Sequence, residues 1–332
     1  MSAGRAAVAV LVVLAALTAC AAPPDRPAPT DPAGTPRAVA TARGPLPGGP
    51  VRPPAHGAYL GAYAKPDPVT QPGRILAVDD LQGQLGRRLD IVHTYRKWTD
   101  PFDTESDRAF QDNGSVLLYS WAGTDTREIT TGRYDTLIAE RARQVRAMRR
   151  PILLEWRWEM DRPNLRAEMW SPADYVAAWR HLRTVFAAQH VTNASWVWCP
   201  TANGFAPGGD APAFYPGDAY VDWLCVDAYP GRRVRPLTDV LTPFLTWARR
   251  HRKPIVIGEY GAPKSYGSPA RAAWLRGAAA EFRANPQIRA ACYYDSDPDR
   301  DRPVERYALR GDPRALAAFT AMARDPYFTP QG

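Results

Sequence analysis

The sequence predicts an α/β protein folded as a (β/α)8 TIM barrel. Eight β-favouring apolar runs alternate with amphipathic helical patterns between residues 55 and 330, as expected for parallel strands joined by crossover helices. A doubly wound open sheet is the competing arrangement. It usually needs fewer strands, and its nucleotide-binding form carries a glycine-rich first turn that this sequence lacks. We therefore expect one barrel domain over residues 55–330.

Each strand is expected where a short run is rich in aliphatic and aromatic residues, at 57–63, 89–95, 114–121, 151–159, 193–200, 220–229, 253–260 and 288–295. Amphipathic periodicity predicts long helices at 133–150, 171–189, 236–251 and 268–285, and shorter ones at 75–86, 103–112 and 313–323. Ser171 before Pro172 and Ser268 before Pro269 are typical of an N-cap followed by a first-turn proline, so we expect helices to begin there.

The first 54 residues differ in composition from the rest of the chain. Residues 1–20 combine a basic start, an apolar run and the sequence LTAC, which resembles a bacterial lipoprotein signal and implies lipidation of Cys20. An ordinary cleaved signal or an anchor helix is the alternative, although the run is short for a bilayer span. Residues 21–54 are proline-rich and lack aromatic residues, which predicts a disordered linker. The protein is then extracytoplasmic, lipid-anchored to the cell membrane or secreted.

The charge pattern argues against a nucleic-acid partner. The formal net charge is +8, but the arginines that carry it are scattered along the chain, and no nucleic-acid-binding module is recognisable. The remaining cysteines are Cys199, Cys225 and Cys292, all in or beside apolar strand-like runs. We expect buried free thiols, with a Cys199–Cys225 disulfide as the alternative. Neither the cysteines nor the histidines show metal-ligand spacing, so we expect no metal or cofactor. We also expect the protein to be a monomer.

Two glutamates stand where apolar strand-like runs end. Glu159 closes PILLEWRWE and Glu259 lies in KPIVIGEYG, and a carboxylate in such a place is costly unless it is solvated, paired or catalytic. Barrel active sites lie at the C-terminal ends of the strands, and a pair of carboxylates across a sugar is the requirement for glycosidic bond hydrolysis. We interpret the pair as catalytic. The alternative is a structural carboxylate, with Glu159 bridged to Arg157.

Several motifs occur together in the order found in one family. The fourth-strand run ending in Glu-Met, AWRHLRTVF (178–186), WVWCP (196–200), YPGDAYVDWLCVDAYP (215–230) and KPIVIGEYG (253–261) resemble glycoside hydrolase family 26, a family of retaining barrel enzymes. Its members are mainly endo-β-mannanases, with β-1,3-xylanases and mixed-linkage glucanases. The resemblance implies that Glu159 is the acid/base, Glu259 the nucleophile, and Tyr229 a hydrogen-bond donor to Glu259. It also implies a β-linked, mannan-like polysaccharide substrate.

The chain departs from the family pattern beside the first glutamate. Trp158 stands where the family usually has histidine, and Glu155 where it commonly has arginine, which puts mannan specificity in doubt. The remaining candidate sugar-binding residues are Arg157, Trp198, Tyr294 and His93. Barrel-core packing is the alternative for Trp198 and Tyr294, and a core position is the alternative for His93.

Two other functions compete with the mannanase-like reading. The chain can be a polysaccharide-binding lipoprotein that kept the barrel but lost hydrolysis, which the replacements at residues 155 and 158 motivate. It can also be a glycosidase of a neighbouring clan family that acts on a bacterial envelope glycan.

Overall fold

The computed structural model describes residues 48–298 and 305–329. The predicted signal segment, Cys20 and most of the predicted linker lie outside these residues. Across the two described stretches, no helix has both the length and the apolar character that crossing a bilayer requires.

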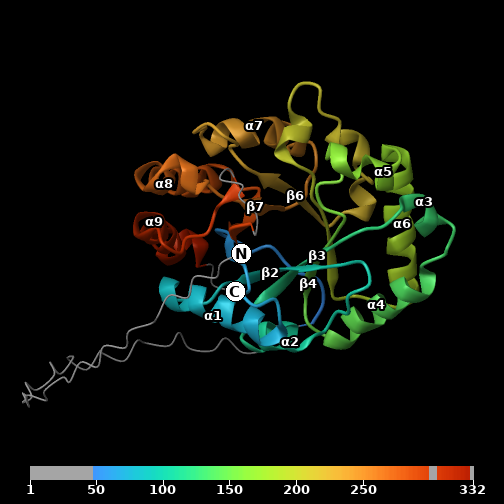
Figure 1. The fold of residues 1–332 in the computed structure, drawn as a ribbon. Coiled ribbons are helices and arrows are strands. Elements are labelled where there is room, and N and C mark those ends of the chain that lie inside the picture. The colour runs from blue at the N-terminus through green and yellow to red at the C-terminus, as the bar shows by residue number, and fades with distance from the viewer. Residues whose placement is uncertain (1–47, 299–304, 330–332) are drawn as a thin grey trace, which may run out of the picture. The chain divides into compact units, whose positions relative to one another are not determined.

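The predicted barrel is confirmed. Eight parallel strands pair in chain order and close into a ring, with β8 hydrogen-bonded to β1 (Figure 1). They are β1 (Tyr59–Ala64), β2 (Ile91–Arg96), β3 (Val116–Trp121), β4 (Ile152–Trp156), β5 (Ala194–Trp198), β6 (Trp223–Ala228), β7 (Ile255–Tyr260) and β8 (Ile288–Asp295). Each strand overlaps a predicted run. Strands of this kind are buried on both faces, so their sequences are apolar almost throughout and can be recognised.

Helices surround the ring, as Figure 1 shows. They are α1 (Gln71–Leu85), α2 (Glu105–Asp112), α3 (Thr126–Thr130), α4 (Asp135–Met148), α5 (Arg166–Met169), α6 (Pro172–Ala188), α7 (Leu237–Ala248), α8 (Ser268–Ala284) and α9 (Pro313–Arg324). The prediction for Ser171 is confirmed, since its hydroxyl accepts a hydrogen bond from the Asp174 N–H at 3.1 Å. The prediction for Ser268 is wrong. Gly267 is the N-cap of α8, at φ 79°, and the Ser268 hydroxyl instead donates to Asp312.

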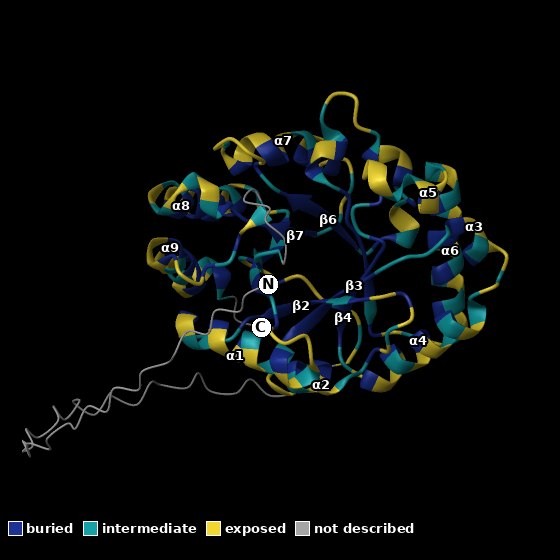
Figure 2. Cartoon of the chain, viewed as in Figure 1, coloured by how far each residue is buried: buried dark blue, intermediate teal, exposed yellow. Residues whose placement is uncertain are grey.

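Alternate residues of each strand serve two different cores. One set points into the barrel, where Leu118, Leu153, Val197 and Val256 pack together. The other set packs against the helices, as the ring of buried strands and the mostly exposed outer helix faces indicate (Figure 2). Val51 closes the barrel at the N-terminal ends of the strands, with its N–H donating to Ser195 Oγ at 2.9 Å.

The cysteine prediction is corrected in part. Cys199 and Cys225 form a disulfide inside the barrel, so the expectation of free thiols is wrong for these two and the alternative pairing is right. Cys292 is buried and free, as expected. The sequence left the pairing open because it does not show that parallel strands β5 and β6 place the two side chains next to each other.

Two glycines provide a test of this packing. A Cβ on Gly61 of β1 would lie 2.6 Å from Cys292 Sγ and 2.8 Å from Ile91 Cβ, whereas a Cβ on Gly277 of α8 would meet nothing within 4 Å. Gly61→Ala should therefore lower the free energy of unfolding by ~1–3 kcal/mol through overpacking. Gly277→Ala should raise it by ~0.5–1 kcal/mol through helix propensity. Denaturant unfolding measures both changes, and equal effects would contradict the described barrel interior.

Candidate active site

A cavity of about 690 Å³ opens at the C-terminal ends of the strands. Its lining is rich in carboxylates and tyrosines, with two arginines: Glu159, Asp161, Asp210, Asp227, Glu259, Glu305, Tyr229, Tyr294, Tyr307, Arg162 and Arg166. The two glutamates that the sequence singled out therefore share one cavity, although they are one hundred positions apart in the chain. This is the end of a barrel where side chains from different strands converge on a ligand.

Glu259 is held by two tyrosine hydroxyls. It lies on β7 and is 7% exposed. Tyr95 donates to its Oε1 at 2.5 Å, and Tyr229 donates to its Oε2 at 2.7 Å. Each carboxylate oxygen thus has its own donor, which fixes the side chain and favours its charged form. The contact from Tyr229 is the one that the family resemblance implied.

Glu159 lies just beyond its strand. The predicted run reached residue 159, but β4 ends at Trp156. Both Arg157 and Glu159 adopt left-handed backbone conformations, at φ 49° and 55°. Such conformations cost roughly 1–3 kcal/mol each for residues other than glycine and are often found at functional sites. The Glu159 N–H donates to the Cys199 carbonyl at 2.7 Å, which anchors the turn that aims the carboxylate into the cavity.

Arg162 is the partner of Glu159. Its Nη1 lies 2.5 Å from Glu159 Oε2, and the arginine side chain is half exposed. The alternative in which Arg157 bridges Glu159 is wrong, because Arg157 pairs with Glu168 instead. The turn after Trp156 breaks the strand alternation on which that alternative rested.

Burial shifts the pKa values of both glutamates upward. Removal from water raises the pKa of Glu259 to about 7, with a further rise from the nearby Glu159 charge, while the hydrogen bonds from Tyr95 and Tyr229 oppose the rise. Burial also raises the pKa of Glu159, and the Arg162 charge opposes it. The two groups interact, so protons leave them in steps that belong to the pair. A proton held near neutral pH is suited to acid–base chemistry.

Two other predicted residues lie at or near the cavity. Tyr294 lines it and stacks on Tyr63, with ring centroids 5.3 Å apart. Trp158 is half-buried, and its ring lies 5.3 Å from that of Tyr95. Both therefore belong to the aromatic surroundings of Glu259.

Three predicted residues do not line the cavity. Trp198 is fully buried among Tyr215 and Trp247 on the helix side of β5, so the alternative of core packing is right. His93 is buried inside the barrel, 2.6 Å from Ser120 Oγ, and burial lowers its pKa to about 3, which keeps it neutral. Arg157 forms an ion pair with Glu168.

Sequence reasoning missed Tyr95 and Arg162 as site residues. Tyr95 lies two residues after His93 and therefore points to the same, inward side of β2. Its position at the end of the second predicted run could have indicated a site residue. For Arg162 the signal was a charge three residues after Glu159. Asp161 was also missed. It receives bonds from the Thr201 N–H at 2.9 Å and the Thr201 hydroxyl at 2.5 Å, and thereby joins the loops after β4 and β5.

Part of the chain resembles known proteins in sequence. Residues 107–246 match the family model described as Glycosyl hydrolase family 26. The chain is 27% identical over 271 residues to Endoglucanase H of Acetivibrio thermocellus, covering 75% of this chain and 29% of that protein. It is 27% identical over 151 residues to Beta-1,3-xylanase TXYA of a Vibrio species, covering 43% of this chain and 30% of that protein. The chain thus spans less than a third of the length of these relatives. Together these matches show that the chain is similar to glycoside hydrolases.

Solved structures share the fold. A GH26 β-mannanase from Bacteroides ovatus aligns with a TM-score of 0.60 at 16% identity, covering 82% of this chain and 90% of that one. A modular endo-β-1,4-mannanase from Cellulomonas fimi aligns with a TM-score of 0.61 at 18% identity, covering 82% and 71%. At these identities the likeness establishes the barrel architecture.

The raised pKa of Glu259 predicts a pH-dependent stability. Its folded pKa of about 7 lies above the ordinary value of 4.5, so its contribution is present below pH 4.5 and is lost as the pH rises through 7. Glu259→Gln keeps the shape but cannot ionise. Relative to the parent, it should gain ~3 kcal/mol of unfolding free energy between pH 4 and pH 9. Denaturant unfolding across that range measures the gain, with Glu140→Gln, an exposed position on α4, as the control. Parallel pH profiles for the parent and Glu259→Gln would contradict the buried carboxylate.

Proposed function

We propose that this protein is a retaining glycoside hydrolase that cleaves a β-linked, mannan-like polysaccharide. The observation that carries the proposal is the convergence of Glu159 and Glu259 on one cavity at the C-terminal end of the barrel. In this proposal Glu259 is the nucleophile, because two hydroxyl donors orient it and favour its charged form. Glu159 is the acid/base, as the family resemblance implies, and its half-exposed partner Arg162 leaves its protonation free to change.

The reaction proceeds in two displacements. A Glu259 oxygen bonds to the anomeric carbon while the bond to the leaving oxygen breaks, and Glu159 gives that oxygen its proton. The product of this step is a glycosyl ester of Glu259. Glu159, now ionised, then takes a proton from water as the water oxygen attacks the anomeric carbon, and Glu259 leaves as a carboxylate.

Arg162 has to leave Glu159 before the first step. Its ion pair favours the charged form of Glu159, which cannot donate a proton. The arginine side chain is half exposed, so a bound sugar chain can displace it into water. Loss of the positive neighbour lets burial raise the pKa of Glu159 further, and the acid then forms when substrate is present.

The substrate class and the location are parts of the same proposal. The relatives and fold neighbours are named an endoglucanase, beta-1,3-xylanases and β-mannanases, and the family resemblance favours mannan. Lipidation of Cys20 would hold the protein at the outer face of the membrane. The linker predicted for residues 21–54 is wrong for Val51, which packs into the barrel; the segment before it would give a monomeric barrel reach toward the polymer.

A polysaccharide-binding protein without hydrolysis is the second candidate. The observation that favours this candidate is that Arg162 already donates a hydrogen bond to Glu159 in the structure. Binding of a glycan panel without release of reducing ends would support this function. Covalent labelling of Glu259 by a fluorinated mechanism-based glycoside would exclude it.

Removal of either glutamate should abolish most of the activity. We expect Glu159→Ala and Glu259→Ala to lose ~10²–10⁴-fold or more in kcat on the polysaccharide found in a screen of mannan, xylan, glucan and envelope polymers. Release of reducing ends measures the loss. Glu140→Ala, on the exposed face of α4, should retain the parent rate. If either active-site variant cleaves as fast as the parent, the assignment is wrong.

Loss of a tyrosine hydroxyl should move the pH profile. Without Tyr95 Oη, the charged form of Glu259 loses a donor, its pKa rises, and the acidic limb of kcat/KM shifts to higher pH. A hydrogen bond to a charged group is worth about 1.5–3 kcal/mol, which corresponds to a shift of about 1–2 pH units for Tyr95→Phe. Tyr119→Phe is the matched control, since that hydroxyl faces Met148 on the helix side. An unchanged acidic limb in Tyr95→Phe would remove the tyrosine from this role.

A further inference from the structure

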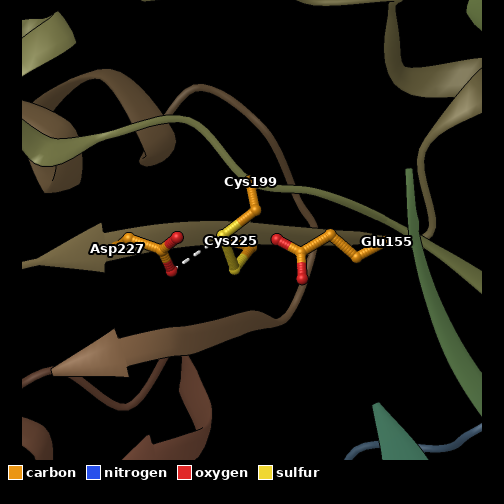
Figure 3. A group of neighbouring side chains, drawn as sticks. All are labelled: Glu155, Cys199, Cys225 and Asp227. Carbon is orange, nitrogen blue, oxygen red and sulfur yellow. Dashed lines mark hydrogen bonds between the residues drawn. A yellow bond between two sulfur atoms is a disulfide. The ribbon is translucent and has the colours of Figure 1, made fainter. Parts of the chain in front are cut away.

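Four potential metal ligands gather inside the barrel beneath the cavity. Glu155 comes from β4, Cys199 follows β5, and Cys225 and Asp227 belong to β6. One oxygen or sulfur atom from each lies within 4.8 Å of the corresponding atoms of the other three. Figure 3 shows the two carboxyl groups on either side of the disulfide, both directed toward the sulfur atoms.

The two carboxyl groups are buried with unused ligand atoms. Glu155 is 1% exposed and Asp227 is 3% exposed. Ser120 donates to Glu155 Oε2, but Glu155 Oε1 and Asp227 Oδ2 have no hydrogen-bond partner among the described residues. A buried polar oxygen without a partner costs roughly 1–3 kcal/mol, so a native chain that keeps two of them next to each other indicates a missing partner.

Gly258 of β7, the strand that pairs with β6, has no side chain that would press on the cluster. A Cβ at this position of β7 would lie 2.6 Å from Cys225 Sγ, 2.7 Å from Asp227 Oδ1 and 3.0 Å from Cys199 Sγ. Any residue with a side chain would press on three of the four candidate ligands. The absence of a side chain at 258 therefore lets these three residues pack directly against the backbone of β7.

We propose that Glu155, Cys199, Cys225 and Asp227 bind one thiophilic divalent cation of the zinc class when the two cysteines are reduced. Two thiolates with two carboxylate oxygens form a donor set that zinc accepts in tetrahedral geometry. Ligand atoms around such an ion lie roughly 3.3–3.8 Å from one another, given bonds of about 2.0–2.3 Å. Small side-chain movements therefore convert the cluster into a closed site.

The disulfide and the metal exclude each other. A dithiol reductant supplies two electrons and two protons to the Cys199–Cys225 bond, yielding two thiols and the cyclic disulfide of the reductant. The cation then displaces the thiol protons, and any proton held by Asp227 or Glu155, to water. Burial raises the pKa of both acids. The positive charge of a bound ion would oppose this rise and favour the ionised carboxylates that ligate it.

The test compares reduced and oxidised chains for bound zinc. Both cysteines are buried, at 1% and 0% exposure, so the full chain is produced in a reducing cytoplasm and purified with a dithiol and excess zinc ion. An oxidised sample is made without either addition. After gel filtration, elemental analysis should find one zinc per folded reduced chain and none per oxidised chain. Cobalt(II) in place of zinc should give the absorption bands of a tetrahedral thiolate site.

Variants distinguish this site from adventitious binding. Cys199→Ser should weaken the thiolate-to-cobalt charge-transfer band, since only the Cys225 thiolate remains, and both Cys199→Ser and Asp227→Asn should weaken zinc affinity by ~10–100-fold or more. Cys292→Ser is the matched control, since Cys292 is also buried in the barrel but lies outside the cluster. It should keep one zinc. Circular dichroism establishes that each sample is folded. A folded reduced parent without zinc, or a zinc affinity in folded Cys199→Ser equal to that of the parent, overturns the proposal. Neither readout depends on hydrolysis.

Discussion

The exclusion of water from Glu259 governs the chemistry of the cavity. A carboxylate that is 7% exposed would be protonated at neutral pH unless hydrogen bonds supported its charge. Tyr95 and Tyr229 supply that support from two other strands. The result is a group with a pKa of about 7, which changes its charge near neutrality.

The charge of Glu159 is supported by a partner whose side chain can move. It is not on the strand ladder but on a turn in a left-handed conformation, and its charge is matched by Arg162 from the same loop. A partner on a half-exposed side chain can be exchanged for substrate, whereas the tyrosines of Glu259 are built into the barrel wall. The two glutamates thus differ in how firmly the structure holds the partners that support their charge.

The interior beneath the cavity holds two further acids. Burial raises the pKa values of Glu155 and Asp227, and the charge of the nearby Glu259 raises them further. Their second oxygens lack partners among the described residues. The disulfide between them fills the space but neutralises nothing, so the charge balance of this layer is set by protons or by a bound cation. The same layer contains Glu155, where the family commonly has arginine.

The sequence by itself determined the barrel, the order of its elements and the pair of glutamates. Strand and helix patterns are local properties of adjacent residues, and a carboxylate that ends a buried run is visible without a structure. The aromatic candidates could not be sorted in the same way, because Trp198 and Tyr294 both end strands, yet one faces the helices and the other the cavity. The partners of Glu159 and Glu259, the disulfide and the buried acid cluster also depended on tertiary structure. These contacts join residues from separate strands and loops, and only closure of the sheet and the turn after Trp156 decide which side chains meet.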